Sequence, residues 1–352
     1  MAGIPYRLTR VGVLMTPDPD DPREAEGVLN PASGRGPDGE LYLLPRLVAD
    51  GNVSRVGLAR VVVEDGAPVG VERIGMVLEP DRGWERGVGN AGVEDPRTTW
   101  IGALGLHVMT YVAYGPLGPR TALAVSQDLR SWHRLGPALF RYEDALDMDL
   151  NLFHNKDTVF FPEPVTAPDG TEALAVLHRP MWDLGETRPG QGVRVPAGVT
   201  DERQSIWISY VPLDAVRADI RNLALWEQHR FVAGPEFAFE EVKIGGGPPP
   251  LRVPEGWLVL HHGVTGVIDS AFSQQQKVNY AAGALLLDAD DPSRVLARTP
   301  EPLLAPETDD ERSGIVPNVV FPTAIEEIDG RLFVFYGMAD SKIGVALLER
   351  TD

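Results

Sequence analysis

The feature of this sequence that most constrains its fold is a pattern that recurs five times. Each copy begins with a loop that ends in proline near a polar residue, and continues into an apolar strand and then a second strand containing small residues. The loops lie at residues 29–32, 94–97, 161–164, 246–249 and 320–323. Five units of about 70 residues, each with room for four strands, predict an all-β fold, a five-bladed β-propeller.

The five units span nearly all of the chain, so we expect one propeller domain over residues 1–352. Residues 183–203 are polar and rich in glycine and proline, and they extend the third unit. A loop of this kind predicts a mobile segment over one face of the disc. Helix is scarce, and residues 214–225 are the best candidate, although they are equally compatible with a turn.

Charge and composition restrict the partners of the protein. The formal net charge is −19, from 32 Lys plus Arg against 51 Asp plus Glu. This field repels nucleic acid and anionic membranes, so we expect neither as a partner. There are no cysteines, which excludes disulfides and thiolate metal sites. The first residues lack a signal-peptide pattern and no run is long enough to span a membrane, so we expect a cytoplasmic protein.

One short stretch, residues 90–99, concentrates reactive side chains between a glycine-rich loop and a strand. It contains Glu94, Asp95 and Arg97, with Pro96 between the last two. Proline stiffens the backbone and favours an extended conformation for the residue before it, so we expect Asp95 to be extended and rigidly placed. Two interpretations remain open here. One is a catalytic acid, and the other is a structural ion pair between Arg97 and one of the two acids.

A propeller brings the starts of its innermost strands together around a central funnel. Polar residues in or just after the five loops and strands would meet there, which predicts a functional site rather than a purely structural polar channel. They are Asn30, Arg46, Asp95, Arg97, Lys156, Asp157, Glu163, Arg179, Lys243, His262, Asn318 and Asp340.

Seven motifs in this order resemble glycoside hydrolase family 130 and cover nearly the whole chain. They lie at residues 92–97, 155–163, 177–180, 243–250, 261–264, 318–322 and 336–340. The family consists mostly of inverting phosphorylases of β-mannosides, with some β-mannoside hydrolases, built as five-bladed propellers. The resemblance therefore implies phosphorolysis of a β-mannoside, giving α-mannose 1-phosphate.

The resemblance also implies roles for individual residues. Asp95 would be the general acid and would protonate the glycosidic oxygen through the 3-hydroxyl of the mannosyl unit. Phosphate is already a nucleophile and needs cations rather than a second carboxylate. The implied phosphate-binding residues are Lys156, Arg179, His262 and Tyr280, and the implied sugar-binding residues are Asn30, Arg46, Lys243 and Asp340.

Structural interpretations stay open for three of these residues. Arg46 is equally compatible with pairing to an acid of the funnel, Asp340 with a turn, and His262 with a satisfied histidine at a strand end. Trp84 and Trp182 are candidates for a platform under the acceptor sugar, although tryptophan is more often a core residue.

Two other functions are compatible with the same residues. One is a β-mannoside hydrolase, in which Glu163 or another funnel carboxylate activates water, and the other is a sugar-binding propeller without catalysis. We expect no metal and no cofactor, with inorganic phosphate as a co-substrate, because the acids and histidines lack recognisable ligand spacing. The linkage, the acceptor sugar and the chain length remain open, as does the choice between a monomer and a homo-oligomer.

Overall fold

The fold is all-β. The computed structural model describes residues 3–183, 190–268 and 275–351. Residues 184–189 of the predicted loop 183–203 therefore lie outside the described residues. The described strands form four hydrogen-bonded sheets of four, eight, six and five strands.

The eight-stranded sheet follows the N-terminal strand, and the other three follow it in chain order. It contains β2 (Gly27–Arg35), β3 (Leu41–Ala49), β4 (Val53–Glu64), β5 (Ala67–Leu78), β6 (Ala91–Ile101), β7 (Leu106–Gly115), β8 (Gly118–Ser126) and β9 (His133–Pro137). The six-stranded sheet contains β10 (Leu139–Phe140), β11 (His154–Phe160), β12 (Val165–Thr166), β13 (Glu172–Met181), β14 (Ile206–Pro212) and β15 (Leu225–Ala233). The five-stranded sheet contains β16 (Lys243–Gly246), β17 (Leu251–Val253), β18 (Gly256–Val267), β19 (Lys277–Leu287) and β20 (Val295–Arg298). The four-stranded sheet contains β21 (Val320–Ile328), β22 (Arg331–Met338), β23 (Lys342–Arg350) and β1 (Tyr6–Met15).

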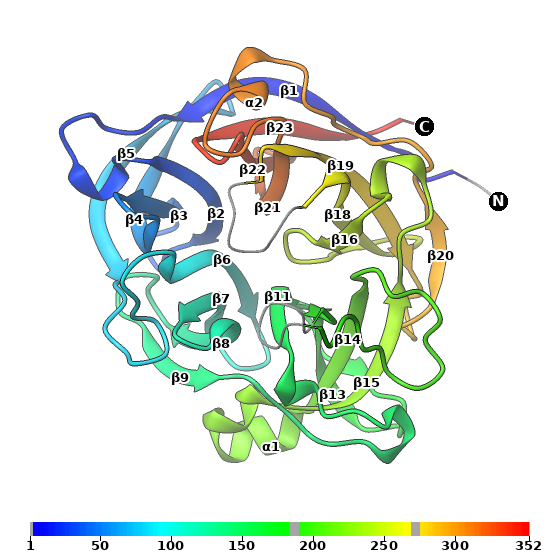
Figure 1. Ribbon diagram of the computed structural model, residues 1–352. Coiled ribbons are helices and arrows are strands. Elements are labelled where there is room, and N and C mark those ends of the chain that lie inside the picture. Colours follow the sequence, from blue (N-terminus) through cyan, green and yellow to red (C-terminus); the bar gives the residue numbers. More distant parts are fainter. Residues whose placement is uncertain (1–2, 184–189, 269–274, 352) are drawn as a thin grey trace.

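The sheets are arranged in a ring. Figure 1 shows β2, β6, β11, β16 and β21 nearest the centre, and β1, β9 and β20 at the rim. The eight-stranded sheet divides into β2–β5 and β6–β9, because strand pairing between its halves is limited to two parallel pairs, Val53 with Ala91 and Ser54 with Gly92. The ring is closed by β1, which pairs antiparallel with β23 from the other end of the chain.

Short helical segments lie in the connections between strands. The helices are α1 (Leu213–Ala218) and α2 (Asp309–Arg312), and the 3-10 turns are η1 (Pro22–Glu24), η2 (Asp144–Leu146), η3 (Leu150–Leu152), η4 (Ile220–Ala224) and η5 (Ala238–Glu240). The helix predicted over 214–225 is thus confirmed in part, as α1 followed by η4. The break falls at Asp219, which is extended and accepts a hydrogen bond from the backbone N–H of Arg221. Aspartate in this position caps the second segment and ends the first.

A buried ion pair that sequence inspection missed occurs once in each group of strands around the ring. A glutamate just before an innermost strand forms an ion pair with an arginine on a rim strand. We call these the five Glu–Arg pairs: Glu24–Arg73, Glu85–Arg134, Glu143–Arg230, Glu240–Arg298 and Glu311–Arg10. Four of the glutamates are almost fully buried, and Glu143 is partly exposed. Each pair connects the inner and outer edges of one group of strands, so it holds that group together across its width.

Among the described residues, no helix has the length and apolar character needed to cross a membrane.

Candidate active site

A cavity of about 230 Å³ lies among the innermost strands. Its walls include the nine residues to which the family resemblance assigned a catalytic, phosphate-binding or sugar-binding role: Asn30, Arg46, Asp95, Lys156, Arg179, Lys243, His262, Tyr280 and Asp340. These residues come from the four sheets, and they are far apart in the chain. The predicted convergence of polar side chains at the centre is therefore what the structure contains.

Asp95 lies in a β-bulge rather than in the extended conformation expected before proline. Its φ is +45°, and the pairing of β6 with β7 is interrupted between Glu94 and Arg97. The same irregularity recurs in β2, where Asn30 has a φ of +41° before Pro31. Asn and Asp tolerate the left-handed region better than most residues, and bulges redirect side chains. Both side chains consequently line the cavity, and strained backbone is typical of functional sites.

The carboxylate of Asp95 is held by two donors. Its Oδ1 accepts hydrogen bonds from Asn30 Nδ2 at 2.9 Å and from Arg46 Nη1 at 3.0 Å. Burial acts to raise the pKa of Asp95, but Arg46, Lys156 and the hydrogen bond from Asn30 outweigh it and lower that pKa below its ordinary value. Asp95 is therefore ionised at neutral pH while the cavity holds no anion.

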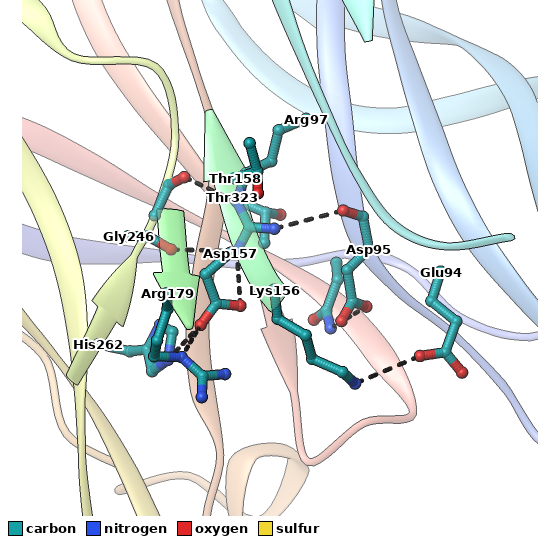
Figure 2. Close-up of polar contacts among 12 residues, drawn as sticks. Glu94, Asp95, Arg97, Lys156, Asp157, Thr158, Arg179, Gly246, His262 and Thr323 are labelled. Carbon is teal, nitrogen blue, oxygen red and sulfur yellow. Dashed lines mark hydrogen bonds and ion pairs between the residues drawn. The ribbon is translucent and has the colours of Figure 1, made fainter. Parts of the chain in front are cut away.

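Glu94 is a cavity residue that sequence reasoning did not assign. It is buried, and Arg46 Nη2 lies 2.9 Å from its Oε1. Lys156 Nζ lies 3.5 Å from its Oε2 (Figure 2). Arg46 thus spans both acids, as the structural interpretation of this residue expected. Successive residues of a regular strand point to opposite faces, so a strand alone would not place Glu94 and Asp95 in one cavity. The bulge at Asp95 makes this possible.

The ion pair considered between Arg97 and the acids of its own strand is not formed. Arg97 Nη2 lies 3.6 Å from Asp157 Oδ1, and its Nε and Nη2 donate to the carbonyls of Gly247 and Gly246 at 2.8 and 3.1 Å. Its contact with Asp95 is to the backbone carbonyl, at 3.3 Å. Arg97 is 1% exposed, so it is a buried connection between β6 and the segment containing β16.

Asp157 organises the cationic side of the cavity. It accepts a hydrogen bond from Arg179 Nε, and His262 Nε2 lies 3.4 Å from its Oδ2 (Figure 2). Arg179 Nη1 also donates to Gln204. Burial would raise the pKa of Asp157, but Arg179, His262 and Arg97 together lower it well below its usual range. Asp157 is thus a fixed negative charge that orients Arg179 toward the cavity.

His262 and Tyr280 line the cavity as uncharged groups. Burial holds the pKa of His262 well below its ordinary value, and neither ring nitrogen has a hydrogen-bond partner among the described residues. Burial raises the pKa of Tyr280, whose hydroxyl donates to Gln275 at 2.7 Å. A neutral imidazole carries one N–H, so His262 can give an anion at most one hydrogen bond.

Lys243 and Asp340 carry opposite charges when ionised, and the pKa of each is shifted toward neutral pH. Burial, together with Arg179 and Lys156, lowers the pKa of Lys243 to about 7. Burial and the nearby carboxylates of Asp95 and Glu94 raise the pKa of Asp340 to about 6. Perturbed groups of this kind gather at functional sites, and both residues change charge close to neutral pH.

Glycines let the backbone approach the key side chains closely. A Cβ added at Gly337 would lie 2.0 Å from Asn30 Oδ1, and one at Gly245 would lie 2.1 Å from Asp157 Oδ2. Both distances are far below van der Waals contact. Any other residue at these positions would displace Asn30 or Asp157, so the two glycines are part of the site.

Besides Arg97, four candidates from the sequence lie outside the cavity walls. Asn318 is one of them, and its carbonyl accepts a hydrogen bond from the backbone N–H of Tyr280 at 2.9 Å. Glu163 is exposed and outside the cavity walls, because the loop at 161–164 follows the end of β11. Trp182 is 0% exposed and packs against Phe153 and Trp207, so it is a core residue rather than a sugar platform. Trp84 is 37% exposed but is also absent from the cavity walls.

The described residues contain no cluster of three or more acids or histidines with the geometry of a metal site.

Comparison with known proteins identifies relatives over most of the chain. Residues 53–351 match the model of glycoside hydrolase family 130, which is described as beta-1,4-mannooligosaccharide phosphorylase. A 1,2-beta-oligomannan phosphorylase from a Thermoanaerobacter species is 32% identical over 265 residues, covering 74% of this chain and 69% of the relative. A beta-1,2-mannobiose phosphorylase from the same source is 32% identical over 307 residues, covering 85% and 78%.

Solved structures share the fold. The beta-1,2-mannobiose phosphorylase from Listeria innocua, in complex with beta-1,2-mannobiose, superimposes with a TM-score of 0.70 at 22% identity, covering 99% of this chain and 97% of that one. The family match extends over most of the sequence, and the curated relatives match at about one third identity. The chain therefore belongs to glycoside hydrolase family 130, as its seven motifs predicted.

Proposed function

We propose that this protein catalyses the inverting phosphorolysis of a β-mannoside by inorganic phosphate, giving α-mannose 1-phosphate. The observation that carries the proposal is the position of Asp95 in a cavity together with four cationic side chains. They are Arg46, Lys156, Arg179 and Lys243. The relatives named as phosphorylases of β-mannosides support it.

In the proposed reaction, phosphate attacks the anomeric carbon from the face opposite the leaving group. The bond between that carbon and the glycosidic oxygen breaks, and a bond to a phosphate oxygen forms. Asp95 supplies the proton that the leaving oxygen needs, by way of the 3-hydroxyl of the mannosyl unit. One carboxyl group and an anion site are sufficient, because the dianion of phosphate needs no base to activate it.

The charge of the cavity explains how Asp95 can act as an acid although its pKa is low in the free protein. An anion between Lys156 and Arg179 would offset the positive charges that hold the pKa of Asp95 down. Phosphate binding would then raise that pKa and favour the protonated carboxyl. On this account the acid becomes available only when the nucleophile is present, which disfavours hydrolysis by water.

Arg179 and Lys156 are the main phosphate ligands in this proposal. The N–H of Arg179 Nε and one N–H of its Nη1 are engaged by Asp157 and Gln204, so an anion would bind through the remaining N–H groups of Nη1 and Nη2. Lys156 would contribute a charge shared with Glu94. Neutral His262 would donate a single hydrogen bond, and Tyr280 would do so by exchanging its contact with Gln275.

The sugar next to the cleaved bond would be held by the remaining predicted residues, Asn30, Arg46, Lys243 and Asp340. Carboxylate, amide and ammonium groups suit hydroxyl recognition, and such hydrogen bonds can strengthen as charge develops in the transition state. Glu94 acts as a positioning residue in this arrangement, because it fixes both Arg46 and Lys156.

We also propose that the ring is a single five-bladed propeller domain over residues 1–352. The eight-stranded sheet would count as two blades, since strand pairing between its halves is limited to two parallel pairs. The five Glu–Arg pairs support this count, because one pair falls within each proposed blade. Cytoplasmic location and the absence of nucleic-acid and membrane partners stay predictions from the sequence.

The reaction is tested with purified protein and β-mannobiose of each linkage, 1,2, 1,3 and 1,4, with and without phosphate. Mannose 1-phosphate and free mannose are followed separately. We expect mannose 1-phosphate only when phosphate is present, from at least one linkage. Release of mannose at the same rate without phosphate would identify a hydrolase instead, and no turnover of any substrate would leave a sugar-binding protein.

Two variants test the assignment of the anion site. Lys156→Ala and Arg179→Ala are expected to raise the KM for phosphate about tenfold or more, with a smaller change in the KM for the sugar. Each variant removes a positive charge that contacts the phosphate and leaves the groups that bind the sugar hydroxyls in place. A change confined to the sugar KM would overturn the division of the cavity into anion and sugar parts.

A further inference from the structure

A second cavity, of about 590 Å³, lies at the other end of the innermost strands. Its walls include Ser33 and Arg35 from β2, Thr98 and Trp100 from β6, and Glu326 from β21. On β6 the active-site cavity is lined by Glu94 and Asp95 instead. Four residues of strand rise about 13 Å, so the two cavities are separated along the axis of the ring.

Buried side chains fill the layer between the two cavities. Arg97 is bonded to the carbonyls of Gly246 and Gly247, and Thr323 Oγ1 donates to the carbonyl of Pro31 at 2.7 Å (Figure 2 shows Arg97, Gly246 and Thr323). Thr99 Oγ1 donates to the carbonyl of Phe160 at 3.1 Å. The bonds of Arg97 join β6 to the segment containing β16, and the two threonine bonds join β21 to β2 and β6 to β11. The second cavity is therefore a separate site and not an extension of the first.

One wall of the second cavity is apolar and rigid. It contains Trp100 and four prolines, Pro37, Pro162, Pro249 and Pro250. Trp100 is 50% exposed, and its ring packs against His107 with 4.7 Å between centroids. A tryptophan that is fixed on one side and open on the other offers a flat surface for stacking.

Polar groups converge in the same cavity. Thr98 and His107 are 5% and 4% exposed, and Thr98 Oγ1 and His107 Nδ1 have no hydrogen-bond partner among the described residues. Glu326 Oε1 accepts a hydrogen bond from Ser33 Oγ at 2.7 Å. Buried polar atoms of this kind need partners, and whatever fills the cavity must supply them.

The charge state of these groups favours an uncharged occupant. Burial lowers the pKa of His107 to about 4, so it is neutral at physiological pH. Burial also raises the pKa of Glu326. Arg35, the cation in the walls, already donates to the carbonyls of Gly39 and Glu327. Arg35 is the only Lys or Arg among the wall residues, so this cavity lacks the cluster of cations found beside Asp95.

We propose that the second cavity binds a neutral pyranoside, with one sugar face stacked on Trp100 and hydroxyls bonded to Thr98, His107 and Glu326. A pyranose has this combination of an apolar C–H face and donors and acceptors around its edge, and the volume lies within the range of small-molecule sites. The proposal does not depend on the reaction at Asp95, because it concerns different side chains.

Binding is measured with β-1,2-mannobiose and cellobiose as probes, by calorimetric titration of Asp95→Asn protein, in which turnover is blocked. We expect two binding events per chain for at least one probe. Adding Trp100→Ala should weaken one event about tenfold and leave the other unchanged, because only one site loses its stacking surface. The matched control is Phe231→Ala, an aromatic that is 44% exposed and outside both cavities, and it should change neither event.

Two further measurements locate the site and separate it from catalysis. Crystals soaked with the same probes should show a sugar against Trp100, and Trp100→Ala alone should retain the turnover of the unmodified protein. One event per chain, unaffected by Trp100→Ala, would overturn the proposal. It would also fail if Trp100→Ala changed self-association of the protein and left both sugar events intact, since that result would assign the surface to a protein contact.

Discussion

The five Glu–Arg pairs and the active-site cavity both bury charges, but they treat them in opposite ways. In the pairs, each carboxylate is surrounded by donors. Glu240 accepts from two backbone N–H groups, from His261 at 2.7 Å and from Arg298 at 2.8 Å. Burial alone would raise the pKa of Glu240, but these partners lower it to about 2. The charged form is therefore the stable one in the folded protein.

In the cavity, two groups have pKa values shifted so that the charged form is disfavoured. The pKa of Asp340 is raised to about 6, and that of Lys243 is lowered to about 7. Among the described residues, no side chain donates a hydrogen bond to the Asp340 carboxylate, whereas Glu240 has four donors. A charge that the fold itself does not satisfy is available to a ligand. Burial alone therefore does not distinguish a functional acid from a structural one here. The number of hydrogen-bond donors that the protein supplies to the carboxylate does.

The largest expected effect that tests this contrast is on turnover. Asp95→Asn should reduce kcat about a thousandfold, because the amide keeps the shape and loses the transferable proton. Thermal unfolding should still show a cooperative transition, since the five Glu–Arg pairs are untouched. The rate is measured as mannose 1-phosphate release at saturating phosphate. Rates near those of the unmodified protein would place the acid at another residue.

The next effect is on stability. Glu240→Gln should lower the free energy of unfolding by about 3 kcal/mol and leave kcat nearly unchanged, because it removes the buried carboxylate that Arg298 and His261 contact and leaves Arg298 only its exposed partner Glu236. Urea unfolding checks the value. Glu349→Gln, which breaks the exposed pair with Arg7, is the control and should change stability by less than about 0.5 kcal/mol.

The pH dependence of the same variant gives a sharper test. The folded-state pKa of Glu240, about 2, lies below that of the unfolded chain. Its contribution to stability is therefore present above about pH 4.5 and lost as the pH falls toward 2. Glu240→Gln should remove this part of the acid dependence. An unchanged slope in that range would show that the pair does not stabilise the fold.

Asp340→Asn should have the opposite effect on stability. Because the folded-state pKa is raised to about 6, the favourable contribution of Asp340 is present below about pH 4 and lost as the pH rises through 6. Removing the charge should stabilise the protein at pH 7 by about 3 kcal/mol, since the pKa is raised by about two units and one unit corresponds to about 1.4 kcal/mol. The KM for the sugar should rise at least about tenfold. Destabilisation at pH 7 would show that the charge of Asp340 is stabilised by the fold, as that of Glu240 is.

The smallest expected effect concerns the backbone around the site. Gly337→Ala should reduce kcat/KM about tenfold, because its Cβ would displace Asn30 and remove one hydrogen bond to Asp95. Gly70→Ala, where a Cβ meets nothing within 4 Å, is the matched control and should be neutral. If both variants keep full activity, the bond from Asn30 does not position the acid.

Much of this arrangement was predictable from the sequence, because the loops before the inner strands are marked by proline. The nine residues assigned roles from the family resemblance all line one cavity. The marker failed in the third unit. There the bulge equivalent to those at Asn30 and Asp95 lies at Asp157, which has a φ of +53° and is followed by threonine instead of proline. A search keyed on proline selected residues 161–164 instead, and with them Glu163.

Other parts of the site depend on geometry that has no sequence signal. Glu94 and Asp95 are adjacent, and only the bulge lets both face the cavity. The extended conformation expected for Asp95 was wrong for the same reason. The five Glu–Arg pairs were missed because the two partners of each pair lie on different edges of a sheet and the glutamates are unevenly spaced. Closure of the ring by β1 joins the two ends of the chain, and local patterns do not report such contacts.

The layer of side chains around Arg97 has a consequence for how a long substrate would meet the enzyme. A carbohydrate chain cannot be threaded along the axis, because the guanidinium and the carbonyls bonded to it block the passage. Substrate must therefore reach the cavity beside Asp95, and products must leave it, on the same face of the ring.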